Sequence, residues 1–188
     1  MSEKFAVIGS NSFSGSNFID YLLSNEVEVT GISRSTEPNP VFLPYKKNGN
    51  ISLFKFYQLD LNKDLEKIVN LINETKPDYV INFAAQGMVA ESWKHPEHWF
   101  QTNTLSSVML HDQLRKCNFL KKYVHVSTPE VYGSCEGLVK ENIIYNPSTP
   151  YAVSRAAADM SLMSFYKNYG FPVVFTRSAN VFGPAQQL

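Results

Sequence analysis

The sequence predicts an α/β protein, a doubly wound parallel β-sheet with helices on both faces. Short apolar runs alternate with longer segments of helical period along the chain, and this alternation is typical of parallel sheets covered on both sides. The first apolar run, at residues 5–8, leads directly into a turn rich in glycine and serine. Hydrophobic residues make up 44% of the 188, enough for the core that such a fold needs.

Each element can be placed from its pattern. Strands are expected where short apolar runs occur, at 5–8, 27–32, 54–59, 79–84, 123–126 and 173–176. Helices are expected where apolar residues recur at helical spacing, near 15–23, around 65–72, and at 100–116 and 151–168. Segment 37–50 contains three prolines and a glycine, so we expect a loop there.

Charge and cysteine content exclude several classes of protein. Lysine plus arginine number 17, as do aspartate plus glutamate, and zero net charge argues against general binding to nucleic acid or anionic membranes. No apolar run reaches the roughly 20 residues of a membrane span, and Glu3 and Gly9 interrupt any signal peptide. We expect a cytoplasmic protein. Cys117 and Cys135 suit neither a disulfide framework nor a zinc site, so we expect buried, reduced thiols and no metal.

The turn after the first strand has the features of a phosphate-binding turn. Gly9, Ser12 and Gly15 are spaced three apart between a strand and a helix. Small residues there let the backbone approach a pyrophosphate, while the helix N-terminus supplies N–H donors. Ser12 replaces the usual middle glycine, and an ordinary strand-to-helix turn is the alternative. The context favours nucleotide binding.

The end of the second strand bears on which dinucleotide is bound. NAD-binding proteins usually have an acidic residue there for the ribose 2′-hydroxyl, whereas this chain has Ser33, Arg34 and Ser35. An arginine flanked by hydroxyls suits a 2′-phosphate, so NADP is slightly favoured over NAD; a solvated arginine is the alternative. Asp60, after the third strand, could bond an adenine or cap the next helix.

Tyr151 and Arg155 form a candidate catalytic pair. Thr149 can cap a helix and Pro150 suits its first position, which places Tyr151 and Arg155 four apart on one face. A free phenol has a pKa near 10, and a cation one turn away favours the phenolate. Tyr151 could then accept a proton from a sugar hydroxyl. The alternative is an aromatic side chain packed on the core.

Thr128 and Glu130 follow the fifth strand, at the edge of the sheet where open α/β folds bind ligands. If the strand end is extended, both side chains point to the same side. Thr128 could bond the reacting sugar oxygen. Glu130 could remove a C–H proton beside a newly formed ketone. The alternative for Glu130 is a carboxylate at the rim.

The order and spacing of these motifs resemble the extended short-chain dehydrogenase/reductases. Within them, the chain is most similar to the NAD-dependent epimerase/dehydratase group, especially the dTDP-glucose and GDP-mannose 4,6-dehydratases. The resemblance runs from Phe5 to the last residue and includes the glycine turn, Asp60-Leu61, 82–86, 101–103, 127–133, 151–155 and 177–184. It implies a Rossmann-like NAD(P)-binding domain spanning 1–188.

The resemblance also implies roles for individual residues. Tyr151 would be the base for oxidation at C4, Arg155 would stand in for the lysine that holds the nicotinamide ribose, and Glu130 would remove the C5 proton of a nucleotide-diphosphate sugar. Asn103 would steady the catalytic helix. The remaining cofactor residues would be Phe13, Leu61, Ala84, Ala85 and Ser127, and the remaining substrate residues would be Gln86 and Asn180.

Departures from the family pattern leave alternatives open. Arginine at 155 keeps the charge of lysine but is bulkier and cannot deprotonate, and Pro129 occupies the place of an aspartate acid in dTDP-glucose dehydratases. The chain ends at Leu188, where a C-terminal substrate lobe should begin, which suggests a fragment. We therefore expect a 4,6-dehydratase; a 4-epimerase, a decarboxylase or a dinucleotide-binding module without turnover are the alternatives. Helices 100–116 and 151–168 would pair two subunits into a homodimer, unless their apolar residues face the sheet.

Overall fold

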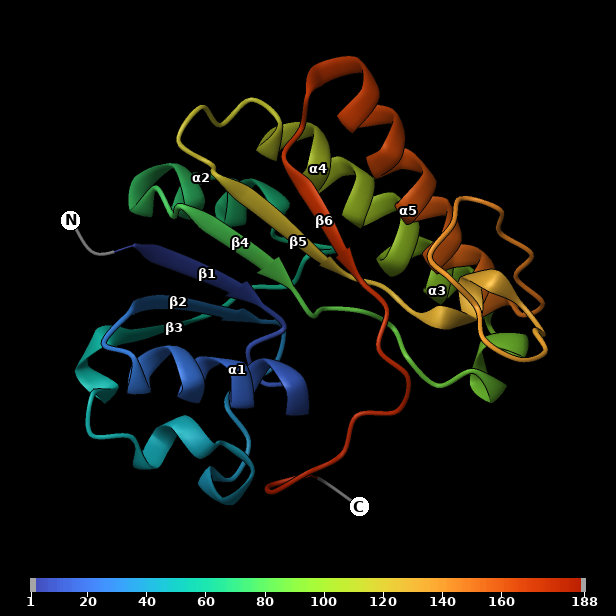
Figure 1. Ribbon diagram of the computed structural model, residues 1–188. Helices are drawn as coiled ribbons and strands as arrows, with labels where there is room; N and C mark the ends of the chain where they lie inside the picture. The colour runs from blue at the N-terminus through green and yellow to red at the C-terminus, as the bar shows by residue number, and fades with distance from the viewer. Residues whose placement is uncertain (1–2, 187–188) are drawn as a thin grey trace.

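The computed structural model describes residues 3–186, and they build one six-stranded sheet in the order β3-β2-β1-β4-β5-β6 (Figure 1). All five neighbouring pairs of strands are parallel. The strand order reverses between β1 and β4, which is where doubly wound sheets open a crevice for ligands. The strands are β1 (Lys4–Ile8), β2 (Glu28–Ser33), β3 (Phe54–Gln58), β4 (Tyr79–Asn82), β5 (Lys122–Val126) and β6 (Val173–Thr176).

Helices cover both faces of the sheet, which confirms the predicted fold class (Figure 1). On one face, α1 (Phe13–Ser24) packs in a cluster that includes Val7 and Val29. On the other face, a cluster around Ala6, Ile8 and Val80 includes residues of α2 (Leu65–Thr75), α4 (Ser107–Leu114) and α5 (Pro150–Tyr169). Within residues 3–186, no helix combines the length and apolar character needed to cross a membrane.

The predicted loop at 37–50 is more ordered than its composition suggests. It contains the 3₁₀ turns Pro40–Phe42 and Pro44–Lys47, each beginning with a proline; a third turn, Ile51–Leu53, follows. Leu43 and Tyr45 are completely buried in the α1 cluster, and Tyr45 Oη donates to Glu37 Oε1 at 2.8 Å. Proline at the first position suits short helical turns as well as loops, so the predicted loop is an ordered connection built around short 3₁₀ turns.

The predicted helix at 100–116 has two parts. Its first part, Phe100–Ser106, is a π-helix, and the regular helix α4 begins only at Ser107. Just before it lies the single turn α3 (Pro96–Trp99). A π-helix closes hydrogen bonds over five residues and is often found at functional sites. The apolar spacing predicted a helix there but not its wider turn.

The two cysteines differ from their predicted burial. Cys117 is partly buried and Cys135 is exposed, and both are free thiols. Burial raises the pKa of the Cys117 thiol, in keeping with an inert side chain. Cys135 lies in the exposed stretch 134–144 before α5, where apolar side chains such as Leu138 and Ile143 are exposed as well, so its predicted burial was wrong.

Candidate active site

The turn between β1 and α1 requires small residues because its backbone atoms pack closely. Gly9 has a φ of +85°, and a Cβ there would lie 2.6 Å from the backbone N of Ala84. A Cβ on Gly15 would lie 2.3 Å from the carbonyl oxygen of Gly9. Ser12 caps α1: its hydroxyl accepts from Gly15 N at 3.0 Å and donates to Gly9 O at 2.7 Å. The serine therefore closes the turn where the usual pattern has glycine.

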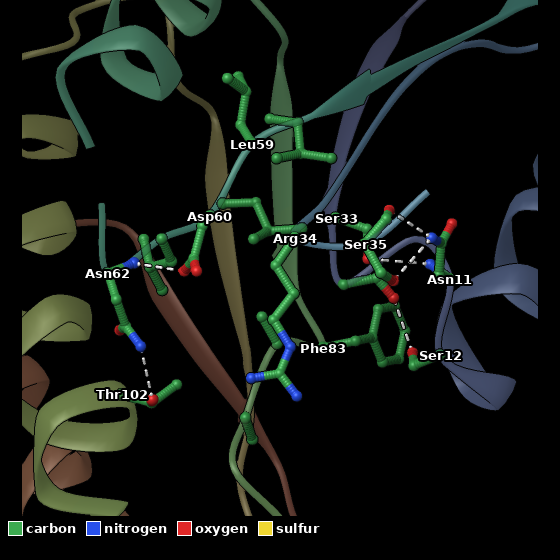
Figure 2. A pocket seen from close by; sticks show the side chains of 16 residues that line it. Asn11, Ser12, Ser33, Arg34, Ser35, Leu59, Asp60, Asn62, Phe83 and Thr102 are labelled. Atoms are coloured by element: carbon green, nitrogen blue, oxygen red, sulfur yellow. Dashed lines mark hydrogen bonds between the residues drawn. The ribbon is translucent and has the colours of Figure 1, made fainter. Parts of the chain in front are cut away.

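A pocket of about 260 Å³ opens at the carboxyl ends of β1, β2, β3 and β4, beside this turn (Figure 2). It gathers eight of the residues predicted to bind the cofactor: Gly9, Ser12, Ser33, Arg34, Asp60, Leu61, Ala84 and Ala85. Residues far apart in the sequence thus meet at the point where the strand order reverses, as expected for a doubly wound sheet.

Three further polar residues line this pocket and were missed from the sequence. Asn11 Nδ2 donates to the backbone oxygens of Ser35 and Thr36, both at 3.0 Å. Asn62 Nδ2 donates to Thr102 Oγ1 at 3.0 Å across the other side (Figure 2). The position of Asn11 within the glycine turn could have indicated its role. No sequence signal links Asn62 to Thr102, which lie 40 positions apart.

The structure rules out one of the two predicted roles of Asp60. The N-cap of α2 is Asp64, not Asp60, and Asp60 Oδ1 instead accepts from Asn62 N at 2.9 Å. The capping alternative was therefore wrong. Asp60 is a lining residue of the pocket, where its carboxylate can accept hydrogen bonds from a ligand.

A second pocket of about 460 Å³ lies on the other side of the α1 N-terminus. It is formed by the start of α1, the ends of β5 and β6, and the segment that follows β6, and Phe83 lines both pockets. Of the predicted site residues only Phe13 lines it, while Asn180 is exposed in the same segment without lining it. The sequence did not predict that residues 181–184 would lie against α1.

The start of α5 is built as the sequence predicts. Thr149 Oγ1 accepts from Ala152 N at 3.1 Å, and Pro150 is the first helical residue. Tyr151 is only partly buried, and its backbone N donates to Ser92 Oγ at 3.2 Å. The phenol is therefore not enclosed in the core, which would have removed it from any chemistry.

Glu130 and Thr128 do not lie on an extended strand end. Residues Pro129–Tyr132 form a 3₁₀ turn, and Thr128 caps it by accepting from Glu130 N at 3.3 Å. Thr128 is buried while Glu130 is exposed. The argument that both side chains share one side of a strand was wrong, because proline at position 129 starts a helical turn as readily as it ends a strand.

Asn103 joins the segment after β4 to α5. Its Oδ1 accepts from Gln86 N at 2.7 Å, and its Nδ2 donates to Gln86 O and to Ser154 Oγ, both at 3.0 Å. Next to it, Thr104 Oγ1 donates to Ser154 O at 2.9 Å. Asn103 is completely buried and lines neither pocket. Its side chain therefore has no surface that a cofactor in either pocket could contact directly.

Arg155 also lies in the core. It is 2% exposed, its Nη2 donates to Val126 O, and Nη2 lies 3.4 Å from His125 Nε2. Its Nε and Nη1 are buried without a hydrogen-bond partner among the described residues, and burial lowers the pKa of the guanidinium. Arg155 lines neither pocket.

A cluster of buried polar side chains lies next to Arg155, and only part of it could be predicted from the sequence. Tyr123 Oη accepts from Asn82 Nδ2 at 3.1 Å and lies 2.9 Å from His111 Nε2. Burial and the nearby guanidinium lower the pKa of His111 to about 3, and the same causes hold the pKa of His125 well below its usual value. Both imidazoles are therefore neutral at pH 7.

The strand order, the glycine turn and the pocket at the reversal point together define a Rossmann-like domain. A family model described as GDP-mannose 4,6 dehydratase matches residues 7–188, and the chain belongs to that family.

Similar proteins agree with this assignment. A dTDP-glucose 4,6-dehydratase of Xanthomonas campestris is 31% identical over 190 residues, which are 95% of this chain and 53% of that protein. The UDP-glucuronic acid 4-epimerase of Bacillus cereus, solved with UDP-glucuronic acid and NAD, superposes with a TM-score of 0.83 at 30% identity, over 98% of this chain and 59% of that one. DesIV, a dTDP-glucose 4,6-dehydratase of Streptomyces venezuelae, gives 0.85 at 27%, over 97% and 57%. The chain spans about half the length of these relatives.

Proposed function

We propose that this chain is the cofactor-binding part of an NAD(P)-dependent 4,6-dehydratase that acts on a nucleotide-diphosphate sugar. The observation that carries the proposal is the pair of pockets that flank the α1 N-terminus and share Phe83. Two pockets joined across a helix N-terminus suit a dinucleotide, whose pyrophosphate is favoured by the free N–H groups and dipole of the helix.

The residues present fit such a cofactor. A side chain on Gly9 or Gly15 would collide with backbone atoms that pack closely at the turn, so the two glycines keep the tight turn that a pyrophosphate approaches. The first pocket would hold the adenosine half, against Asp60, Leu61 and the residues at 33–35, and the second the nicotinamide half, against Phe13. When bound, the nicotinamide would supply reversible hydride transfer.

The protein residues would handle the protons. Tyr151 would accept the proton of the C4 hydroxyl, with the charge of buried Arg155 one helical turn below. The resulting ketone acidifies the C5–H bond, and exposed Glu130 would take that proton and give it to the C6 hydroxyl, which would leave as water. Thr128 and Ser127 would border the sugar, Gln86 and Asn180 would contact the substrate, and Asn103 would hold α5 through Ser154.

The similarity to 4-epimerases supports a second candidate. An epimerase needs oxidation at C4 but no proton removal at C5, so Glu130 would have no chemical role. The two candidates are tested by supplying nucleotide sugars to the protein as its gene encodes it and identifying the product. We expect a 4-keto-6-deoxy sugar; a C4 epimer without loss of water would support the epimerase.

Substitution of Tyr151 tests the chemistry separately from cofactor binding. Tyr151→Phe should lower turnover about 10²- to 10⁴-fold, the range for general acid–base groups, and leave the cofactor Kd unchanged. Glu130→Gln should lower dehydration in the same range. An undiminished rate in Glu130→Gln would remove that residue from the mechanism.

The choice of cofactor depends on Arg34. Structural relatives were solved with NAD, but Arg34 lines the first pocket between two serines, and its guanidinium suits a 2′-phosphate. Arg34→Ala should weaken NADP binding about tenfold or more, as loss of a charge-assisted bond implies, and spare NAD. Lys47→Ala, which removes an exposed cation outside the pocket, is the control. Equal effects on both cofactors would mean that Arg34 does not recognise the 2′-phosphate.

We also propose a homodimer through α4 and α5. Apolar side chains are exposed on these helices and on the π-helix before them: Leu105, Met109, Val153 and Met160. Sedimentation of the wild type against Met160→Asp checks this, and a monomer in both would contradict it. A cytoplasmic location stays a prediction.

A further inference from the structure

Asp159 is a fully buried carboxylate on the same face of α5 as the candidate catalytic pair. It follows Tyr151 by eight residues and Arg155 by four, so the three side chains lie one above another along the helix. Asp159 has no exposed surface and lines neither pocket. An aspartate is almost never fully buried unless it is paired, so its partners identify what it does.

Three donors from three separate segments meet at one oxygen of Asp159. Oδ2 accepts from Ser127 Oγ at 2.8 Å, from Arg177 Nη2 at 2.9 Å and from Tyr145 Oη at 3.3 Å. Ser127 follows β5, Arg177 follows β6, and Tyr145 lies in the loop before α5. The other oxygen, Oδ1, lies 3.4 Å from His125 Nε2. Asp159 thus ties the ends of two strands and a loop to the helix that carries Tyr151.

Arg177 extends this connection to the turn that carries Glu130. Its guanidinium lies 5.4 Å from the ring centroids of both Tyr132 and Tyr145, and it also donates to Tyr145 Oη. Tyr132 is the last residue of the 3₁₀ turn that contains Glu130. Contacts between a cation and aromatic faces at such distances are attractive. The turn is therefore held at its start through Ser127 and at its end through the aromatic rings around Arg177.

Backbone contacts close the same turn. Asn146 N donates to Val131 O at 3.0 Å, and a Cβ on Gly133, whose φ is +74°, would lie 2.0 Å from Asn146 O.

Burial raises the pKa of the Asp159 carboxyl, while Ser127 and Arg177 act in the opposite direction by donating to it. A buried ion pair costs desolvation free energy, which the attraction between its charges returns only in part. Stability alone is therefore a weak explanation for the burial of Asp159 beside Arg177.

We propose that Asp159 is a positioning residue, which fixes the Pro129–Tyr132 turn, and with it Glu130, relative to Tyr151 on the same helix. The expected effect on turnover rests on the proposed function, whereas the arrangement of contacts around Asp159 does not depend on it. Asp159 acts through Ser127, Arg177 and Tyr145 and touches neither the reacting atoms nor the cofactor pockets.

The main test is Asp159→Asn in the protein as its gene encodes it. Asparagine keeps the shape and one acceptor oxygen but loses the charge that holds Arg177. Turnover should fall about 10- to 100-fold, as a misplacement near 1 Å implies, while the Kd for NAD stays within about twofold because Asp159 lines neither pocket. Since Tyr151 keeps its place, oxidation at C4 should be slowed less than proton removal at C5, so reduced nicotinamide should accumulate during turnover.

Asp112→Asn is the matched control. Asp112 lies on the neighbouring helix α4 and pairs with Arg115 at 2.7 Å and Lys116 at 2.9 Å near the surface. It should leave turnover unchanged. Turnover of Asp159→Asn equal to that of Asp112→Asn would overturn the proposal, as would a parallel loss of both chemical steps and of NAD binding.

Two further measurements keep the proposal testable if Asp159→Asn folds poorly or if the proposed reaction is wrong. Tyr145→Phe removes a single donor from a half-buried side chain, and it should lower turnover in the same direction by about threefold. In either variant, hydrogen exchange at the amides of Gly133 and Asn146 should quicken, while exchange at the amide of Lys76, the C-cap of α2, should not. Unchanged exchange at Gly133 and Asn146 would overturn the positioning role even in a protein with no turnover. Quickened exchange without any dehydratase product would instead count against the proposed function alone.

Discussion

The two halves of the sheet treat polar groups in opposite ways. On the β1–β2–β3 side, the polar residues at the carboxyl edge, such as Ser33, Arg34 and Asp60, keep access to solvent and line a pocket. On the β4–β5–β6 side, ionisable side chains are buried instead: His111, His125, Arg155 and Asp159 are each 2% exposed or less.

The difference shows two ways to build a site. In the first half the shape of the backbone builds the site, because the backbone packs so closely at Gly9 and Gly15 that any Cβ there would collide with it. In the second half, buried charges hold one another and the loops above them. The first half should therefore be sensitive to added volume, and the second to protonation and to the loss of single polar atoms.

The largest expected effect is on the second half, through pH. The folded-state pKa values of His111 and His125 lie below the unfolded value near 6.5. Their contribution to stability is therefore complete well above pH 6.5 and is lost as the pH falls, for His111 toward its folded-state pKa of about 3, because the unfolded chain binds the protons first. Between pH 6.5 and pH 5 the protonation of His111 should lower the unfolding free energy by about 2 kcal/mol, and that of His125 should lower it further.

Urea unfolding of the wild type and of His111→Gln at both pH values checks this loss. The variant should lose less stability than the wild type over the same interval, because only His125 still takes up a proton there. A free energy of unfolding that does not change between pH 6.5 and pH 5 would contradict the buried, neutral state of these imidazoles.

A smaller effect is expected from added volume in the first half. Gly9→Ala places a methyl group 2.6 Å from Ala84 N at a positive φ, which should cost about 3 kcal/mol of stability and abolish cofactor binding. Gly49→Ala is the matched control, since its Cβ would meet nothing within 4 Å. Chemical denaturation and NAD titration measure both variants, and equal stabilities would show that the turn relaxes easily.

The smallest effect comes from removing one buried hydroxyl. Tyr123→Phe leaves Asn82 Nδ2 without its acceptor and His111 Nε2 without its neighbour, which should cost about 1–2 kcal/mol. Tyr21→Phe, at an exposed tyrosine on α1, should change the unfolding free energy by less than about 0.5 kcal/mol. Similar values for the two variants would mean that the buried cluster is not cooperative.

The sequence predicted what depends on local pattern. All six strands, the glycine turn and the cap at Thr149 follow from apolar spacing and from residues with a known local preference. Most residues of the first pocket could also be predicted, because they follow strands whose carboxyl ends must meet at one edge.

What the sequence could not predict depends on contacts between distant segments. Nothing in the pattern around Arg155 indicates that its guanidinium turns inward to Val126 and His125. Asp159 resembles any polar helix residue until β5, β6 and the loop before α5 bring three donors to it. The turn at Glu130 was mispredicted because proline after a strand allows both an extended and a helical continuation.

The π-helix at Phe100–Ser106 has a consequence for comparing this chain with its relatives. Consecutive residues of this π-helix serve different elements: Thr102 reaches Asn62 at the first pocket, Asn103 holds Gln86, and Thr104 holds α5. Deleting one residue here would restore an ordinary α-helix and rotate everything before it by about 100°. In an alignment, a one-residue gap in this stretch would therefore change three attachments at once, and percent identity would not reveal it.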